Sequence, residues 1–298
     1  MLDRQYQAMT IDPNRLLIGI ASVQINGEDL GAIKESGIEI TSETKDRYIG
    51  YPAQRHQTET VGVTAIATVT AEEIGGAPLV SLLTNLFDNI ANQNAITYDM
   101  AMFAPYAGGG NLRLSSTTQM LPEISLDFQD EWCNLTFKFE CIGATPTALM
   151  TRSTVDGARL PATTINTMNL SIGKPKMYIT GSSIGSVQSV QVALIGQIKK
   201  VEKGYPKCTE KIIYLESKFE INVTAEEQIL AISNDFEVVI EQAIVDGGAL
   251  RLTFPHCKVQ QDLSVKPVND WLGIRQKIIP FKVEDDNRNI VLFERIPA

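Results

Sequence analysis

The feature that most constrains the fold is an internal repeat. Residues 18–73 align without a gap with residues 172–227, at an offset of 154 positions, and 14 of the 56 aligned positions are identical. The shared segments include Ile-Gly at 18–19, Gly-Tyr-Pro at 50–52 and Val-Thr-Ala-Glu-Glu at 69–73. Self-similarity at a fixed period indicates one structural unit used more than once, so we predict a tandem duplication.

The order of features persists after the offset changes. Gly109–Leu114 resembles Gly247–Leu252, and the two tryptophans, Trp132 and Trp271, each follow an acidic residue. Between the copies, residues 146–168 are rich in Thr, Ala and Pro, which is typical of a linker. A length of 298 residues suits two domains. We therefore predict a first domain over 1–145, the linker over 146–168 and a second domain over 169–298.

Each copy is predicted to be mainly β. Asn26-Gly27 is a strong hairpin signal. Long strands are expected over 30–47 and 61–70, where Val61, Val63, Ala65, Ala67 and Val69 share one face. The second copy keeps this alternation over 219–223, and one apolar face with one polar face is typical of an antiparallel sheet. Short strands are expected over 95–142 and 237–295.

One helix is expected in each copy. In the first copy, the segment 78–92 places Leu79, Leu82, Leu83 and Leu86 on one stripe. In the second copy, 224–236 begins with Thr224 followed by Glu227, the spacing of a capping box. The predicted fold is therefore two tandem β-sandwich or barrel domains, each with one packed α-helix.

The loop between the two long strands, 46–57 in the first copy and 200–211 in the second, is the candidate functional segment. Gly and Pro indicate a loop, yet it carries aromatic side chains, which are enriched at protein interfaces. A tyrosine that folds back on its own sheet is the alternative for either copy, but repetition of Gly-Tyr-Pro favours contact with a neighbour. The predicted contact residues are Tyr48, Gly50, Tyr51, Pro52, Gly204, Tyr205 and Pro206.

Charge disfavours nucleic-acid binding. The formal net charge is −9, and residues 1–150 hold 8 basic and 18 acidic side chains, against 18 and 17 in residues 151–298. A grip on a phosphate backbone requires clustered positive charge, which this acidic chain lacks. The acidity belongs to the first copy.

The N-terminus and the cysteines predict a protein that is not exported and whose thiols are reduced. The N-terminus carries Asp3, Arg4 and Asp12 and has no apolar run of signal-peptide length, and no segment has the length of a membrane span. The four cysteines, Cys133, Cys141, Cys208 and Cys257, form no CxxC pair. We expect them to be reduced and buried as small apolar residues.

No arrangement of residues predicts an enzyme, a cofactor or a metal site. The position equivalent to His56 in the repeat is Glu210, so the two copies share no histidine site. His256 precedes Cys257, but neighbouring strand residues face opposite sides, which argues against a Cys–His pair. The glycines at 108–110, which follow Ala107, lack the lysine and the helix of a phosphate-binding loop, and the similar pair at 247–248 favours a tight turn.

Two long strands joined by an extended loop, then a helix and further strands, resemble the tail tube (major tail) protein of bacteriophages. Type VI secretion tubes share this fold. The segment Leu30–Lys45, running into Gly50-Tyr51-Pro52, is similar in character to such proteins, and the resemblance covers both repeats. The chain departs from the commoner single-domain tube protein by carrying two copies. The resemblance therefore implies a homotrimeric ring with six tube domains.

The resemblance also implies a place and partners. The chain would belong to the tail of a virion, assembled in the host cytoplasm, and would contact tape measure, tail tip and tail terminator proteins. Genome DNA would pass through the channel without specific binding, past an acidic wall that repels it. The Gly-Tyr-Pro loops would reach the ring above or below.

Three other functions stay open at this stage. A tail hub or baseplate ring also uses duplicated tube domains, although such proteins usually carry extra domains. A tandem β-sandwich that binds carbohydrate or a cell surface would need an exposed aromatic platform and an export signal, and the sequence offers neither. A hydrolase on a duplicated barrel lacks its catalytic residues.

Overall fold

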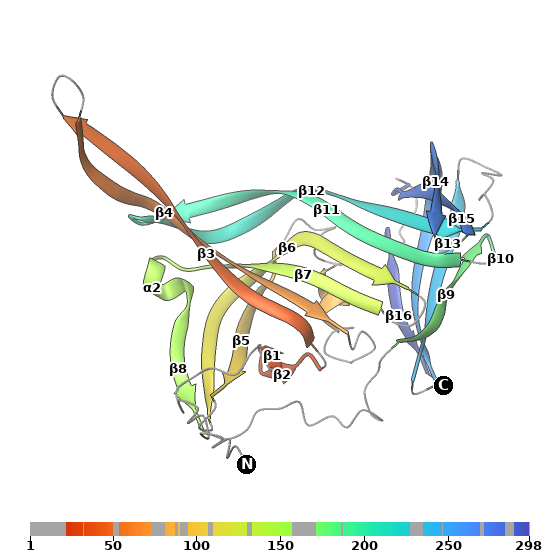
Figure 1. The fold of residues 1–298 in the computed structure, drawn as a ribbon, viewed down its shortest axis with the longest axis horizontal. Helices are drawn as coiled ribbons and strands as arrows, with labels where there is room; N and C mark the ends of the chain where they lie inside the picture. Colours follow the sequence, from red (N-terminus) through yellow and green to blue (C-terminus); the bar gives the residue numbers. More distant parts are fainter. Residues whose placement is uncertain are drawn as a thin grey trace, which may run out of the picture.

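A computed structural model represents the chain (Figure 1). It describes residues 22–31, 33–49, 54–72, 81–86, 89, 95–106, 110–129, 133–156, 171–185, 187–226, 235–245, 247–268, 271–283 and 289–297.

The first copy consists mainly of antiparallel strands. Its strands are β1 (Ser22–Ile25), β2 (Glu28–Asp29), β3 (Ile33–Ile49), β4 (Gln54–Ala71), β5 (Thr97–Pro105), β6 (Asn111–Phe128), β7 (Cys133–Cys141) and β8 (Thr151–Val155). A helical segment covers 81–86, and the short helix α2 covers Pro146–Leu149. The predicted turn at Asn26-Gly27 is confirmed, because both residues have positive φ, 52° and 86°, as the tightest hairpins require.

The second copy repeats this arrangement. Its strands are β9 (Ser171–Ile179), β10 (Ser182–Ile184), β11 (Val187–Lys203), β12 (Lys207–Ala225), β13 (Phe236–Ile244), β14 (Ala249–Val268), β15 (Trp271–Pro280) and β16 (Leu292–Ile296). Ser36 pairs with Val69 between β3 and β4, and Val190 pairs with Val223 between β11 and β12. Both pairs differ by the 154 positions of the repeat, so the duplication extends to strand register.

Four strands in each copy form the same sheet. The order is β3-β4-β7-β6 in the first copy and β11-β12-β15-β14 in the second, with every neighbouring pair antiparallel. Strand β11 also pairs with β6, which joins the two sheets edge to edge. A short parallel contact between β12 and β4 closes β4-β7-β6-β11-β12 on itself. The mainly β prediction is confirmed, and the two copies share one connected sheet.

The core lies on the apolar face of this sheet. The predicted alternation is confirmed by buried Ala65, Ala67 and Val69 in β4, and by a buried face that includes Phe219 and Ile221 in β12. Val61 falls out of this phase because the β3–β4 register shifts between Glu43 and Thr44, whose partners in β4 lie at Gly62 and Thr60.

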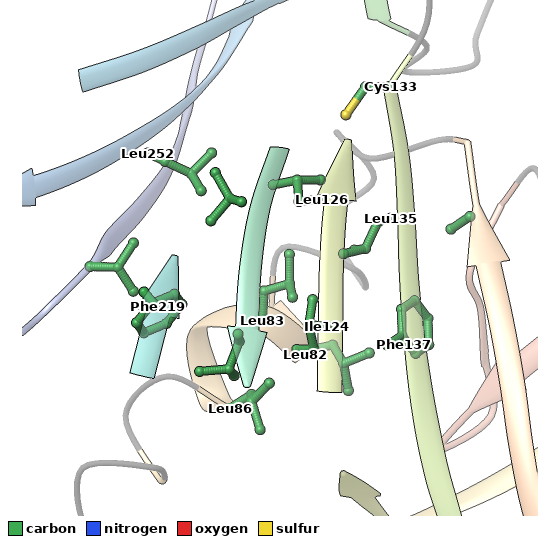
Figure 2. Close-up of a cluster of buried hydrophobic side chains, with 14 of the residues drawn as sticks. Leu82, Leu83, Leu86, Ile124, Leu126, Cys133, Leu135, Phe137, Phe219 and Leu252 are labelled. Atoms are coloured by element: carbon green, nitrogen blue, oxygen red, sulfur yellow. The ribbon is translucent and has the colours of Figure 1, made fainter. Parts of the chain in front are cut away.

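The first helix packs where the two copies meet. Figure 2 shows Leu82, Leu83 and Leu86 beside Ile124 of β6 and Phe219 of β12. All three leucines are buried, so the expected apolar stripe is confirmed over 81–86. Leu79 lies outside the described residues.

The second predicted helix does not begin at Thr224. Strand β12 continues to Ala225, which pairs with Val187 on one side and Ile274 on the other, so the capping-box interpretation is wrong there. Glu227 and the rest of that segment up to 234 lie outside the described residues. The local capping signal favours a helix start at Thr224, but pairing with β11 and β15 holds Thr224 and Ala225 in the sheet.

Strands occupy most of the predicted loops. Strand β3 continues to Ile49 and β4 begins at Gln54, while β11 and β12 leave only Gly204–Pro206 as a turn. Gly and Pro mark the turn itself but do not limit how far the ladder extends on either side. The first-copy hairpin therefore projects as a long arm away from the rest of the molecule (Figure 1).

Two further predictions, the short strands and the linker, differ from the structure. The regions 95–142 and 237–295 contain β6 and β14, of 18 and 20 residues, rather than only short strands. The segment 146–168 begins with α2 and β8, and β8 pairs with β6 of the first copy from Ser115 back to Asn111. Residues 157–168 lie outside the described part of the chain.

Candidate assembly interface

The joint between β6 and β11 is the interface through which one copy recognises the other. Val190 to Ile195 pair antiparallel with Phe128 to Glu123. On the core face, Val192 pairs with Leu126 and Leu194 with Ile124, and all four side chains are buried. The joint combines a backbone ladder with an apolar seam, the form of recognition called β-strand addition.

A glycine permits the close approach of these strands. A Cβ on Gly196 would lie 2.6 Å from the Pro122 ring, which a side chain at that position cannot tolerate. Pro122 falls where the β6–β7 register shifts, between Met120 and Ile124. The bulge and the glycine together let β11 run past β6.

A buried ion pair also connects the copies. Glu140 of β7 has no exposed surface, and both of its carboxylate oxygens accept hydrogen bonds of 2.9 Å from Lys200 Nζ of β11. Thr209 Oγ1 donates a third hydrogen bond of 2.7 Å to the same carboxylate. A charge held out of water needs such partners, so this cluster ties the first copy to the second-copy hairpin.

Further buried hydrogen bonds reinforce this connection. The Tyr214 hydroxyl donates to the Met120 carbonyl at 2.6 Å, and the Ile212 amide donates to Gln119 Oε1 at 2.7 Å. Burial raises the pKa of Tyr214 well above its usual range, with a smaller contribution from Tyr98, so the hydroxyl keeps its proton. No sequence pattern indicated these contacts, because the partners are about a hundred residues apart.

The turn at Gly204–Pro206 lies against the first copy. Gly204 has φ of +83°, and a Cβ there would come within 2.7 Å of the Ala144 carbonyl oxygen. This position therefore needs glycine for both its backbone conformation and its surroundings. The Tyr205–Pro206 peptide bond is cis.

Tyr205 meets the arm of the first copy. Its hydroxyl donates to the Glu59 carboxylate, and this hydrogen bond, more than the neighbouring Arg47, lowers the pKa of Glu59. Arg47 Nη2 lies 2.7 Å from Glu59 Oε2. The tyrosine ring stays 64% exposed.

The equivalent tip of the first copy lies partly outside the described residues. Gly50, Tyr51 and Pro52 fall there. Tyr48, on the projecting arm, is 58% exposed. The structure thus brings Gly204 and Tyr205 against the neighbouring copy and leaves Tyr48 exposed to solvent.

Strand β3 has an open edge. Among the described residues it pairs only with β4, whereas β11, its equivalent, pairs with both β12 and β6. Ile40 of β3 is 52% exposed, but Leu194, at the same place in β11, is 2% exposed. An unpaired edge with an exposed apolar residue is a template for pairing with another chain.

The face of the joined sheet opposite the core is polar and continuous across the joint. Gln191 Nε2 of β11 donates to Ser125 Oγ of β6, and Asn222 Nδ2 of β12 donates to Gln191 Oε1. We refer to this as the polar face. Among the residues whose side chains the structure describes, its charged residues include Glu35, Glu39, Glu43, Glu123, Asp127 and Lys138 of the first copy and Glu216, Lys218, Glu220, Arg275 and Lys277 of the second copy.

The polar face changes sign between the copies. Of these residues, the first copy contributes five acids and one base, and the second copy two acids and three bases. Lys277 Nζ lies 2.7 Å and Lys218 Nζ 2.9 Å from the Glu220 carboxylate. Their hydrogen bonds, that from Lys277 most strongly, lower the pKa of Glu220. The face is thus not acidic throughout.

The described residues present no grouping typical of catalysis. No three His, Cys, Asp or Glu side chains among them are placed to hold a metal ion. His256 Nδ1 is engaged by the Asp235 carboxylate at 2.9 Å, while Cys257 is buried in the core. The four cysteines are free and buried, as predicted, and burial raises the pKa of the Cys257 thiol well above its usual range.

Comparison with known proteins adds no assignment. No protein-family model matches the chain, and no curated protein matches its sequence. In the part of the chain that the structure describes, no helix has the length and apolarity needed to cross a membrane.

Proposed function

We propose that the protein is a structural subunit of a phage tail tube, in which three chains form a ring and rings stack around a channel for genome DNA. The observation that carries this proposal is the edge-to-edge joint between β6 and β11, which repeats one four-stranded sheet within a chain. A repeated sheet that still has an open edge on β3 is suited to continue into further chains. Such a heterologous contact closes into a ring when the rotation between copies permits it.

Strand direction is compatible with a closed ring. Every neighbour from β3 through β6 and β11 to β14 is antiparallel, and each chain contributes eight strands to this series. An even number of alternating strands allows antiparallel addition of the next chain at either end. An even number of strands per chain is therefore compatible with a ring of any number of chains. The proposed number, three, comes from the resemblance to tube rings with six domains.

The polar face is the surface that would line the channel. Its acidic first copy alternates with a second copy that carries more bases than acids, which gives a wall with stripes of both signs. DNA binding depends on clustered cations that release counterions, so such a wall would hold DNA weakly. This pattern differs from the acidic wall that the resemblance implied, because the second copy contributes more bases than acids to the face.

Negative-stain electron microscopy of the purified full-length chain tests the proposal. Hollow tubes or stacked rings of uniform diameter are the expected result, whereas a monomer at high concentration in several salts would refute it. Rings that never stack would favour a hub or baseplate component instead.

The projecting arm supplies a second test. Tyr48→Ser should leave ring formation intact and prevent stacking, because Tyr48 is exposed on the arm rather than engaged at the joint. Tyr205→Ser is the matched variant, since Tyr205 contacts Glu59 of the same chain. If Tyr48→Ser assembles tubes as readily as the unmodified chain, the arm has no role in stacking.

A further inference from the structure

The joint between β6 and β11 is a template for the contact between chains. Each β3 residue recurs 154 positions later in β11. Val69 pairs with Phe137, and its repeat Val223 pairs with Gln276, so β7 recurs in β15 at an offset of 139. Ser125 of β6 pairs with Thr136 of β7, and Ser264 of β14 pairs with Arg275 of β15, so β6 recurs in β14 at the same offset of 139. The segment of β6 that binds β11, residues 123–128, therefore corresponds to residues 262–267 of β14.

The corresponding edges are open in the single chain. Strand β13 pairs with β14 only from Ala249 to Cys257, and β15 and β16 lie on the opposite edge. The β13 side of residues 262–267 therefore pairs with no strand in the described part of the chain. Ser36–Thr41 of β3, equivalent to the β11 segment Val190–Ile195, likewise pairs with β4 and with no other strand among the described residues.

We propose that Ser36–Thr41 of β3 pairs antiparallel with residues 262–267 of β14 in a second copy of this chain, in the register of the β6–β11 joint. This inference rests on the proposed assembly into rings and specifies its seam. The register places Ser36 opposite Pro267, Glu39 opposite Ser264 and Thr41 opposite Asp262. The second copy is the occupant because the seam continues an interface that already exists within each chain.

The residue types suit this register. Ile38 falls opposite Val265 and Ile40 opposite Leu263, which reproduces the apolar pairs of the internal joint. Ile40 would then become buried, as Leu194 is in β11. A slip of one residue would bring Ile38 and Ile40 opposite polar or charged positions, so the apolar pattern selects one register.

Charge favours one relative orientation of the two chains at the seam. The positions diagonally across from Glu39 are Lys266 on one side and Asp262 on the other, so this register brings one opposite and one like charge near Glu39. Two β3 edges facing each other would instead bring Glu35 and Glu39 of both copies together. The head-to-tail arrangement is therefore favoured over a symmetric pair of β3 strands.

Disulfide trapping tests the seam on the full chain. The variant Glu39→Cys/Ser264→Cys places one cysteine on each edge, and directly opposed residues in an antiparallel pair have Cα separations that suit a disulfide. The native cysteines are all buried and do not compete. Ala193→Cys/Ser125→Cys is the matched control, because these residues are paired at the equivalent place within one chain. Glu39→Cys/Val265→Cys is the same variant slipped by one residue.

After mild oxidation, the products are separated on a non-reducing gel. The in-register variant should give a ladder of covalent multimers, about tenfold more than the slipped variant because the slip turns the second cysteine to the other face. The internal control should oxidise at monomer mass. A covalent dimer from Glu39→Cys alone would indicate two facing β3 edges and overturn the inference.

The outcomes separate this inference from the proposed function. If tubes or rings form but the in-register variant stays monomeric while the control oxidises, the seam is wrong and the tube stands. If the variant gives multimers but microscopy shows only open chains, the seam stands and the tube function fails. If the internal control does not oxidise, the template is wrong and the inference falls with it.

Discussion

Lys200→Met tests whether the buried ion pair holds the two copies together. The change removes the ammonium group that donates to both oxygens of Glu140 and leaves that carboxylate with the Thr209 hydroxyl. The side chain of Glu140 is 0% exposed, so water cannot replace the lost partner. The lysine stem keeps its apolar contacts as methionine, and the variant therefore isolates the charge.

The expected loss in the free energy of unfolding depends on how differently the two side chains are buried. Breaking a buried pair by removing one partner costs about 3–5 kcal/mol, and we expect the lower end, about 3 kcal/mol, because the Lys200 side chain is 31% exposed. Glu140→Gln should cost less, because the ammonium left behind reaches water. The double variant Glu140→Gln/Lys200→Met should recover most of the loss, since it leaves no unpaired charge.

Urea unfolding at one fixed protein concentration provides the measurement. A loss of about 3 kcal/mol lowers the midpoint by about 1 M for an m-value near 3 kcal/mol/M. Lys199→Met, one residue along on the exposed side of β11, is the control and should change stability by less than about 0.5 kcal/mol. The reasoning fails if Lys200→Met costs no more than the control, or if Glu140→Gln is the more damaging single change.

Further predictions concern three residues, the buried Tyr214 and Tyr98 and the paired Glu220. Tyr214→Phe should cost about 1–1.5 kcal/mol in urea unfolding because it orphans the Met120 carbonyl, whereas Tyr98→Phe should be neutral or stabilising, since its buried hydroxyl meets no partner among the described residues. Burial raises the pKa of Tyr98 to about 12, so stability falls as pH rises above the ordinary value of 10, and Tyr98→Phe should reduce that fall in alkaline unfolding curves. Lys277 and Lys218 lower the pKa of Glu220, so its contribution is present above the ordinary value of 4.5 and is lost as pH falls through the folded-state pKa. Glu220→Gln should therefore be less stable than the unmodified chain at pH 7, and the two curves should converge in acid; a constant difference down to acid pH would contradict this.

Local patterns in the sequence were sufficient for several parts of the fold. The turn at Asn26-Gly27, the buried faces of β4 and β12 and the burial of the four cysteines follow from short-range chemistry. Each depends only on backbone preference or on the side-chain period of a strand, which neighbouring residues encode. The duplication likewise needs only the comparison of the chain with itself.

Those patterns did not predict where strands end or where the segment after β12 leaves the sheet. Thr224 and Glu227 have the spacing of a cap, yet pairs across the sheet hold Ala225 in β12. Gly-Tyr-Pro correctly marks the turn near Gly204, but the ladder on both sides extends as far as cross-strand pairs are available. A local signal shows where the chain can turn, while long-range pairing decides where regular structure stops.

The sequence by itself determined that this protein is a mainly β chain built from two versions of one unit, with an acidic first copy and buried cysteines. Only the tertiary structure decided how the two versions meet. The pairing of β11 with β6, the burial of Glu140 against Lys200 and the open edge of β3 depend on which strand ends lie side by side. Any strand edge carries the same backbone donors and acceptors, so partner choice is settled by the packing of residues far apart in the sequence rather than by the strand alone.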